Sequence, residues 1–318
     1  MSQAGLRPPR GGLEINAGFR RALDLLEDTD KPVFITGRAG TGKSTLLEHF
    51  RSTTRKQVAV LAPTGVAALN VRGQTIHSFC RFQPDVTLDK VKKLPKSRAG
   101  EAAELYKRLD AVVIDEISMV RADLLDCVEK FLRLNGPLPK LRFGGIQMVF
   151  IGDLYQLPPV VTSREKTLFA APYETPFFFS ARALADGGYP LEFVELEKIY
   201  RQTEPDFIAL LNAVRNRTAG PQDLALLNER CDPAFVPPAD EFYVTLTSTN
   251  DQAFHRNRDK LQTLEGKAFS YDGFAEGDFD NSSLPTDERL ELKIGAQVML
   301  LTNDPQGRWV NGTIGRVV

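Results

Sequence analysis

Over the first half of the chain, short continuous apolar runs alternate with longer stretches whose apolar residues recur at helical spacing. A short apolar run fits a buried strand, whereas apolar residues three and four apart fit one face of a helix. The alternation predicts an α/β fold with a doubly wound parallel sheet, because strands covered by helices on both faces are apolar throughout. The expected strands are residues 32–36, 58–62, 111–115 and 148–152, and the expected helices are residues 13–27, 43–54, 66–71 and 122–134.

A second, less regular α/β pattern begins after about residue 195. Residues 266–290 are rich in Gly, Asp and Ser, which predicts a loop. An Asn311-Gly312 pair is a turn signal between the last two apolar runs. The expected helices are residues 205–217, 223–230 and 250–264, and the expected strands are residues 243–247, 296–301 and 313–318.

Composition, net charge and cysteine spacing exclude some classes of protein but do not identify the function. The 318 residues are 42% hydrophobic and 25% charged, which is typical of a soluble globular protein with two domains. The net charge of −1 gives no general attraction to nucleic acid, so any polyanion surface has to be local. Cys80, Cys127 and Cys231 form no C-x-x-C pair, which argues against a disulfide framework or a zinc site. We found no signal peptide and no apolar run of about 18 residues, so we expect a cytoplasmic protein with no membrane contact.

A glycine-rich segment, Gly37-Arg-Ala-Gly-Thr-Gly-Lys-Ser44, follows the first expected strand and fits G-x-x-x-x-G-K-[ST]. Its glycines permit a tight loop whose amides point at phosphate oxygens, and the following helix presents its positive dipole end to the same anion. Lys43 would reach the β and γ phosphates, and Ser44 would bind Mg²⁺. The predicted nucleotide-binding residues are Gly37, Gly40, Thr41, Gly42, Lys43, Ser44 and Thr45.

Two adjacent carboxylates, Asp115 and Glu116, end the third expected strand. Ligands of open α/β sheets bind at the carboxyl edge of the strands, where this pair would lie. By itself the pair would be typical of a surface turn. Together with the glycine-rich segment it indicates that Asp115 holds Mg²⁺ and that Glu116 polarises the attacking water as general base.

Gln156 follows the fourth expected strand within Gly152-Asp-Leu-Tyr-Gln-Leu-Pro-Pro. Its amide could contact the γ-phosphate or the attacking water, or the segment could be a proline-terminated loop without a chemical role. Residues 81–108 interrupt the α/β rhythm and carry eight basic and four acidic residues, a net charge of +4. Such a segment is either a solvated insertion or a contact for a phosphate backbone.

Taken in order, these segments resemble the motifs of the Pif-one and RecD-type DNA helicases of superfamily one, of the bacterial type, which move 5′ to 3′ along DNA. The resemblance extends over residues 30–318. The matching segments are the glycine-rich loop, 62–68 (APTGVAA), 73–79 (GQTIHSF), 115–119 (DEISM), 143–159 (ending GDLYQLPP), 196–202 (LEKIYRQ) and 295–301 (GAQVMLL) with 310–312 (VNG).

The resemblance implies roles for further residues. Gln156 would sense the γ-phosphate, and Arg201 would contact it from the second domain and so couple ATP hydrolysis to domain closure. Residues 81–108 stand where the family has a wedge-like insertion. For His77 the alternative is a structural histidine at the start of a capped helix. The residues implied to lie on single-stranded DNA are Pro63, Thr64, His77 and Ser78.

The resemblance also implies two RecA-like P-loop motor domains. Residues 1–29 would be an N-terminal segment with a helix, 30–195 the first domain, and 196–318 an incomplete second domain in which an SH3-like β insertion begins near residue 290. No glutamine stands near residues 13–21, where the family has its adenine-contacting residue. Motifs V and VI have no match before Val318, so we expect a fragment.

The leading hypothesis is therefore a fragment of an ATP- and Mg²⁺-dependent 5′–3′ DNA helicase that acts as a monomer on single-stranded DNA and DNA junctions. One alternative is a P-loop ATPase that acts on RNA or protein. Another is a fragment that binds nucleotide and DNA without turnover, because the arginine of motif VI is missing.

Overall fold

The computed structural model describes most of the chain in two compact units, Met1–Asp223 and Leu224–Val318. The described residues are 15–94, 104–161, 172–185, 189–200, 204–238, 241–273, 286–301, 304, 306, 308–309 and 312–318.

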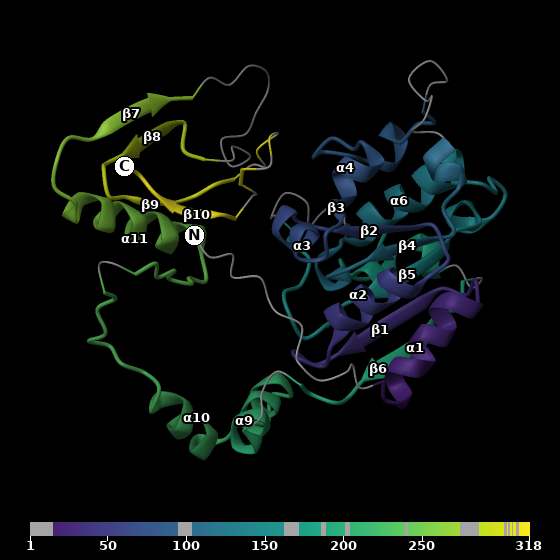
Figure 1. Ribbon diagram of the computed structural model, residues 1–318, viewed down its shortest axis with the longest axis horizontal. Helices are drawn as coiled ribbons and strands as arrows, with labels where there is room; N and C mark the ends of the chain where they lie inside the picture. Colours follow the sequence, from purple (N-terminus) through teal and green to yellow (C-terminus); the bar gives the residue numbers. More distant parts are fainter. Residues whose placement is uncertain are drawn as a thin grey trace. The chain divides into compact units, whose positions relative to one another are not determined.

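A six-stranded sheet forms the centre of the first unit (Figure 1). Its strand order is β3-β2-β4-β5-β1-β6, and every neighbouring pair is parallel. The predicted α/β fold with a parallel sheet is thus confirmed. The strands are β1 (Val33–Gly37), β2 (Val58–Ala62), β3 (Gln74–Thr75), β4 (Ala111–Ile114), β5 (Gln147–Ile151) and β6 (Glu192–Leu196).

Helices α1 and α2 pack on one face of the sheet, and α4 and α6 pack on the other. The α-helices are α1 (Ala17–Asp28), α2 (Lys43–Thr53), α3 (Gly65–Asn70), α4 (Ile76–Cys80), α6 (Ala122–Asn135), α8 (Arg182–Ala185) and α9 (Pro205–Arg215). Short 3-10 turns are η1 (Leu88–Lys90), η2 (Ile117–Met119), η3 (Arg142–Gly145) and η4 (Phe178–Ser180).

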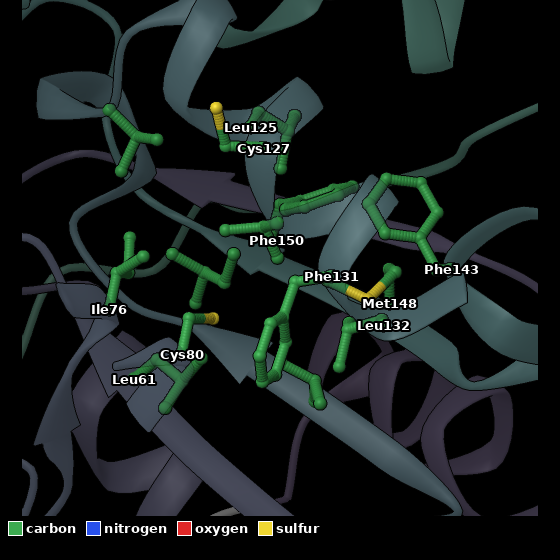
Figure 2. Packing of buried hydrophobic residues seen from close by; sticks show 14 of the residues in the cluster. Leu61, Ile76, Cys80, Leu125, Cys127, Phe131, Leu132, Phe143, Met148 and Phe150 are labelled. Carbon is green, nitrogen blue, oxygen red and sulfur yellow. The ribbon is translucent and has the colours of Figure 1, made fainter. Parts of the chain in front are cut away.

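Alternate residues of each central strand enter two different hydrophobic cores, because successive side chains of a strand point to opposite faces. Met148 and Phe150 of β5 pack in the core beneath α4 and α6, whereas Val149 packs with α1 and α2. Figure 2 shows the first of these cores, in which Phe131 from α6 lies over the sheet. The continuous apolar runs in the sequence therefore reflect burial on both faces.

A buried glutamine, Gln147, opens β5 and is only 1% exposed. Its amide nitrogen donates to the carbonyl oxygens of Leu25 (3.0 Å) and Lys31 (2.8 Å). Its amide oxygen accepts from the ammonium of Lys56 at 2.9 Å. One side chain thus joins the end of α1, the approach to β1 and the approach to β2.

Replacing Gln147 with leucine is expected to lower the free energy of unfolding by about 2 kcal/mol. Leucine is close in size but removes three hydrogen bonds to partly buried groups, and a typical hydrogen bond contributes about 0.5–1.5 kcal/mol to stability. Urea unfolding measures the change. The matched control is Gln57→Leu, because Gln57 is exposed, and its effect should stay within about 0.5 kcal/mol. An equal effect in both variants would show that the buried amide bonds contribute nothing.

The second unit consists of helices and separate pairs of strands that bury few of its described residues. Among its described residues only Ala296 and Asp304 are buried. Strand β7 (Phe269–Asp272) pairs antiparallel with β8 (Arg289–Leu292), and β9 (Gln297–Met299) with β10 (Ile314–Arg316). The helices are α10 (Pro221–Asn228), which spans the boundary between the units, and α11 (Asn250–Thr263), which is capped by Thr249.

Two predictions for this unit are wrong. Residues 243–247 are not a strand, although their apolar residues favour one, because the segment has no hydrogen-bonded neighbour strand. The expected loop 266–290 contains β7 and the start of β8. There Phe269 and Tyr271 alternate with Ser270 and Asp272, a strand signal that the Gly, Asp and Ser content of the surrounding segment obscures.

Candidate nucleotide-hydrolysis site

The glycine-rich loop connects β1 to α2 and depends on backbone conformations that favour glycine. Gly42 has φ +90° and caps the amino end of α2. A Cβ there would lie 3.1 Å from the Phe19 ring, and a Cβ on Gly37 would lie 2.6 Å from the Leu196 carbonyl oxygen. Because neither position has room for a side chain, the backbone of the loop is held close against α1 and β6.

The start of α2 has the form of an anion site. Its first i to i−4 hydrogen bond runs from Leu46 N to Gly42 O, so the amides of Lys43, Ser44 and Thr45 lie in the first turn, where a helix presents N–H groups to an anion. The Thr41 hydroxyl, 1% exposed, donates to Arg38 O at 2.9 Å and closes the loop. All of the predicted nucleotide-binding residues are thus in this loop and turn, with Ser44 and Thr45 exposed.

Lys43 extends back over the loop. Its ammonium donates to the carbonyl oxygens of Gly37 at 2.6 Å and Arg38 at 3.1 Å. Burial lowers the pKa of Lys43, and the nearby charges of Asp153, Glu116 and Asp115 oppose that shift. The P-loop lysine and the carboxylates that follow β4 and β5 therefore share one electrostatic environment.

Asp115 and Glu116 stand at the carboxyl end of β4. Burial, and after it the charge of Glu116, raises the pKa of Asp115 to about 6. The Asp115 amide donates to Leu61 O at 2.8 Å, which joins this turn to β2. Glu116 has φ +51°, a left-handed conformation that redirects the chain into η2. A nearby cation stabilises the ionised form of a buried carboxylate, so Asp115 is suited to act as a metal ligand.

The donor set near Asp115 fits Mg²⁺ better than a metal held wholly by protein. The described residues contain no group of three or more His, Cys, Asp or Glu side chains that could hold a metal ion. Mg²⁺ commonly takes one or two protein oxygens and completes its shell with water and substrate phosphates. The Asp115 carboxylate and the Ser44 hydroxyl would supply those oxygens beside the phosphate loop.

Gln156 lies in the loop that follows β5, the strand between β4 and β1. Its side-chain amide nitrogen donates to the Asp153 carboxylate at 3.1 Å. Its backbone N–H donates to the backbone carbonyl oxygen of Asp153 at 2.9 Å. Gly152, just before, is so close to the η2 turn that a Cβ would lie 2.9 Å from Ile117. The two loops after β4 and β5 therefore pack directly against each other.

Two residues of this site, Asp153 and Arg215, were not predicted from the sequence. Asp153 is 1% exposed and pairs with Arg215 at the end of α9. Asp153 lies two residues after the end of β5, so its position at the edge could have been inferred, whereas Arg215 has no local sequence signal. Arg201 lies outside the described residues. The neighbouring Tyr200 amide donates to Gly40 O at 2.8 Å, so the chain just before Arg201 contacts the P-loop.

The four residues expected on DNA follow the two strands at one side of the sheet. Pro63 and Thr64 follow β2, and the Thr64 hydroxyl caps α3 by accepting from Ala67 N. His77 and Ser78 belong to α4, which follows β3, and Ser78 is exposed. His77 lies in the first turn of this capped helix, as the structural alternative expected, and burial lowers its pKa, which favours a neutral ring at pH 7.

Together, the parallel sheet, the P-loop after β1 and the acidic pair after β4 define a P-loop nucleoside-triphosphatase fold. Residues 19–185 match the family model described as PIF1-like helicase. The chain is 32% identical to the ATP-dependent DNA helicase Pif1 of Bdellovibrio bacteriovorus, over 99% of this chain and 69% of that protein. The chain therefore belongs to the PIF1-like helicase family, which confirms the resemblance.

Other relatives agree and show what part of the family's length is present. The ATP-dependent DNA helicase PIF1 of Emericella nidulans is 32% identical over 94% of this chain but only 40% of its own length. A crystal structure of Bacteroides Pif1 bound to single-stranded DNA aligns with a TM-score of 0.80 at 35% identity, covering 96% of this chain and 69% of that one. The chain thus spans less than half of the fungal relative. No helix in the described residues is long and apolar enough to cross a membrane.

Proposed function

We propose that this chain is the ATP-hydrolysing part of a DNA helicase that moves 5′ to 3′ along single-stranded DNA and unwinds duplexes. The observation that carries the proposal is the gathering of two sets of residues at one edge of one sheet. The nucleotide set follows β1, β4 and β5, and the DNA set follows β2 and β3. Because carboxyl ends of parallel strands share an edge, the two sets are neighbours.

In the nucleotide set, the amides of the P-loop and α2 would bind the phosphates and Lys43 would bridge the β and γ phosphates. Ser44 and Asp115 would hold Mg²⁺, which when bound supplies positive charge to the phosphate oxygens. Glu116 would accept a proton from the attacking water, and Gln156 would sense the γ-phosphate. Arg201 would reach the same phosphate from the second motor domain and link hydrolysis to closure.

In the DNA set, Pro63, Thr64, His77 and Ser78 would contact a single strand. Such contacts bind the backbone and stack on bases, so binding should be nearly independent of sequence and sensitive to salt. A related crystal structure is that of Bacteroides Pif1 in complex with ADP-AlF3 and single-stranded DNA, and another concerns DNA unwinding at forked duplex DNA by Pif1 helicases. These related structures support single-stranded DNA and junctions as the polymer and ATP as the nucleotide.

A short path through the sheet would connect the two sets. The Asp115 amide is bonded to Leu61 O, and Leu61 is two residues before Pro63. A change in the turn that carries Asp115 and Glu116, when the γ-phosphate leaves, would act through this hydrogen bond on the end of β2, where one expected DNA contact begins.

Steady-state ATPase assays with single-stranded DNA, RNA or no polymer test the proposal. Single-stranded DNA is expected to raise kcat by about tenfold or more, equivalent to about 1.4 kcal/mol of the activation barrier. The stimulation should weaken between 50 and 200 mM salt, because phosphate contacts release counterions. Stimulation by RNA and not by DNA would refute the DNA assignment and favour the RNA alternative.

A further inference from the structure

The loop after β5 contains a buried ion pair that neither the phosphate site nor the DNA contacts explain. The Asp153 carboxylate is 1% exposed and accepts from three donors. One oxygen, Oδ1, accepts from Tyr155 N at 3.1 Å. The other, Oδ2, accepts from the Gln156 amide at 3.1 Å and from the guanidinium of Arg215. Arg215 and Gln156 therefore meet on the same carboxylate oxygen.

Arg215 is held in this place by two kinds of contact. Its side chain is only 17% exposed, and its guanidinium lies over the Tyr155 ring at 4.2 Å from the centroid. A planar guanidinium can stack on a ring and donate to a carboxylate at once, which an ammonium cannot do equally well. Arg215 thus contacts both neighbours of Leu154, the residue between Asp153 and Tyr155, and orders the loop that carries Gln156.

Arg215 is the last residue of α9, where a basic side chain could simply interact with the helix dipole. Its contacts with Asp153 and Tyr155 go beyond that role, because both residues belong to another element, more than 55 positions earlier in the chain. α9 is also connected to the site through the chain before it, since the Tyr200 amide donates to Gly40 O. The segment from Tyr200 to Arg215 therefore contacts the P-loop near one end and the Gln156 loop at the other.

The ion pair also sets the charge near the P-loop lysine. After burial, which lowers the pKa of Lys43 most, the charge of Asp153 raises this pKa and the charge of Arg215 lowers it. Without Arg215, Asp153 would be a buried anion lacking its main partner. Such a carboxylate would compete with the γ-phosphate for the Lys43 ammonium and for the Gln156 amide.

We propose that Arg215 is a positioning residue that acts through Asp153 to hold Gln156 in place for γ-phosphate sensing. The inference rests on the proposed function, in which Gln156 reads the γ-phosphate. Arg215 itself does not contact the phosphates. It sets how well the site distinguishes ATP from ADP and makes that distinction depend on the position of α9.

Nucleotide affinities of the 318-residue chain test the inference without requiring turnover. In Arg215→Met, which keeps most of the side-chain length and removes the charge, the preference for ATPγS over ADP should fall about tenfold, while ADP affinity stays within about twofold. Arg215→Lys should fall in between, because it keeps the charge and loses the planar contact. Arg230→Met is the matched control, since Arg230 is exposed beyond α10, and should behave as wild type.

A double-mutant cycle separates positioning from a general structural effect. On a Gln156→Ala background, Arg215→Met should change the ATPγS-to-ADP preference by less than about twofold, because the residue it positions is gone. Additive effects, or an equal loss of ADP and ATPγS affinity in Arg215→Met, would overturn the inference. If wild type binds both nucleotides but has no ATPase activity, the proposed function fails while this cycle still decides the role of Arg215.

Discussion

Glu116→Gln is expected to reduce ATP turnover by about 10² to 10⁴-fold and to leave ATP affinity within about twofold of wild type. General-base catalysis contributes rate factors of that size, and an amide cannot accept the proton of the attacking water. Affinity should survive because Glu116 acts on water, whereas Lys43 and the loop amides bind the phosphates. Glutamine also keeps the shape of the side chain in the left-handed turn at Glu116, so the fold should be unchanged.

Phosphate release measures turnover, and titration with a fluorescent ATP analogue measures affinity. Glu48→Gln is the matched control, because Glu48 is exposed on α2 and loses the same charge. The control should keep wild-type turnover. Loss of nucleotide binding in Glu116→Gln would contradict the assigned role, since it would place Glu116 among the binding groups.

The central sheet could be predicted because its strands are buried on both faces. The prediction for residues 58–62 coincides with β2, and those for β1, β4 and β5 differ by one residue at their ends. β5 begins at Gln147, one residue before the prediction, because the apolar run hides a buried polar residue whose partners are distant in sequence. Local apolar runs therefore predict which strands are central and cannot show which polar residues the fold will bury.

The two edge strands were not predicted, for different physical reasons. β3 contains only Gln74 and Thr75, which is too short for any periodicity. β6 contains Glu192 and Glu195, and only Val194 and Leu196 are buried, because an edge strand is covered less completely. In the second unit, 243–247 resembles a strand in composition, yet strands need a partner, and composition does not specify one.

The candidate site also contains residues that the sequence predicts and residues that it does not. The P-loop and the acidic pair are contiguous motifs at strand ends, so the sequence alone places them at one edge. The ion pair between Asp153 and Arg215 joins residues far apart in the chain, so it could be identified only from the position of α9 in the structure. The roles of the site residues, Arg201 and the DNA set among them, stay predictions.

Lys43→Ala is expected to lower kcat by about 10² to 10³-fold and also to weaken ATP binding, in contrast to Glu116→Gln. The ammonium would stabilise negative charge on the phosphates in both the ground state and the transition state, and losing one such group typically costs about 2.7–4 kcal/mol in the barrier. Lys31→Ala is the matched control, because Lys31 precedes β1 at the opposite edge and pairs on the surface with Glu192.

Parallel ATPase assays and ATP titrations test this prediction in wild type, Lys43→Ala and Lys31→Ala. The control should keep both rate and affinity, since an exposed ion pair contributes only about 0–1 kcal/mol to stability. Equal and negligible turnover in wild type and Lys43→Ala, with ATP affinity lost only in the latter, would mean that the chain binds nucleotide without hydrolysing it. The P-loop would then be a binding site whose catalytic groups are incomplete in these 318 residues. A measurable wild-type rate that Lys43→Ala removes would place the chemistry within this chain.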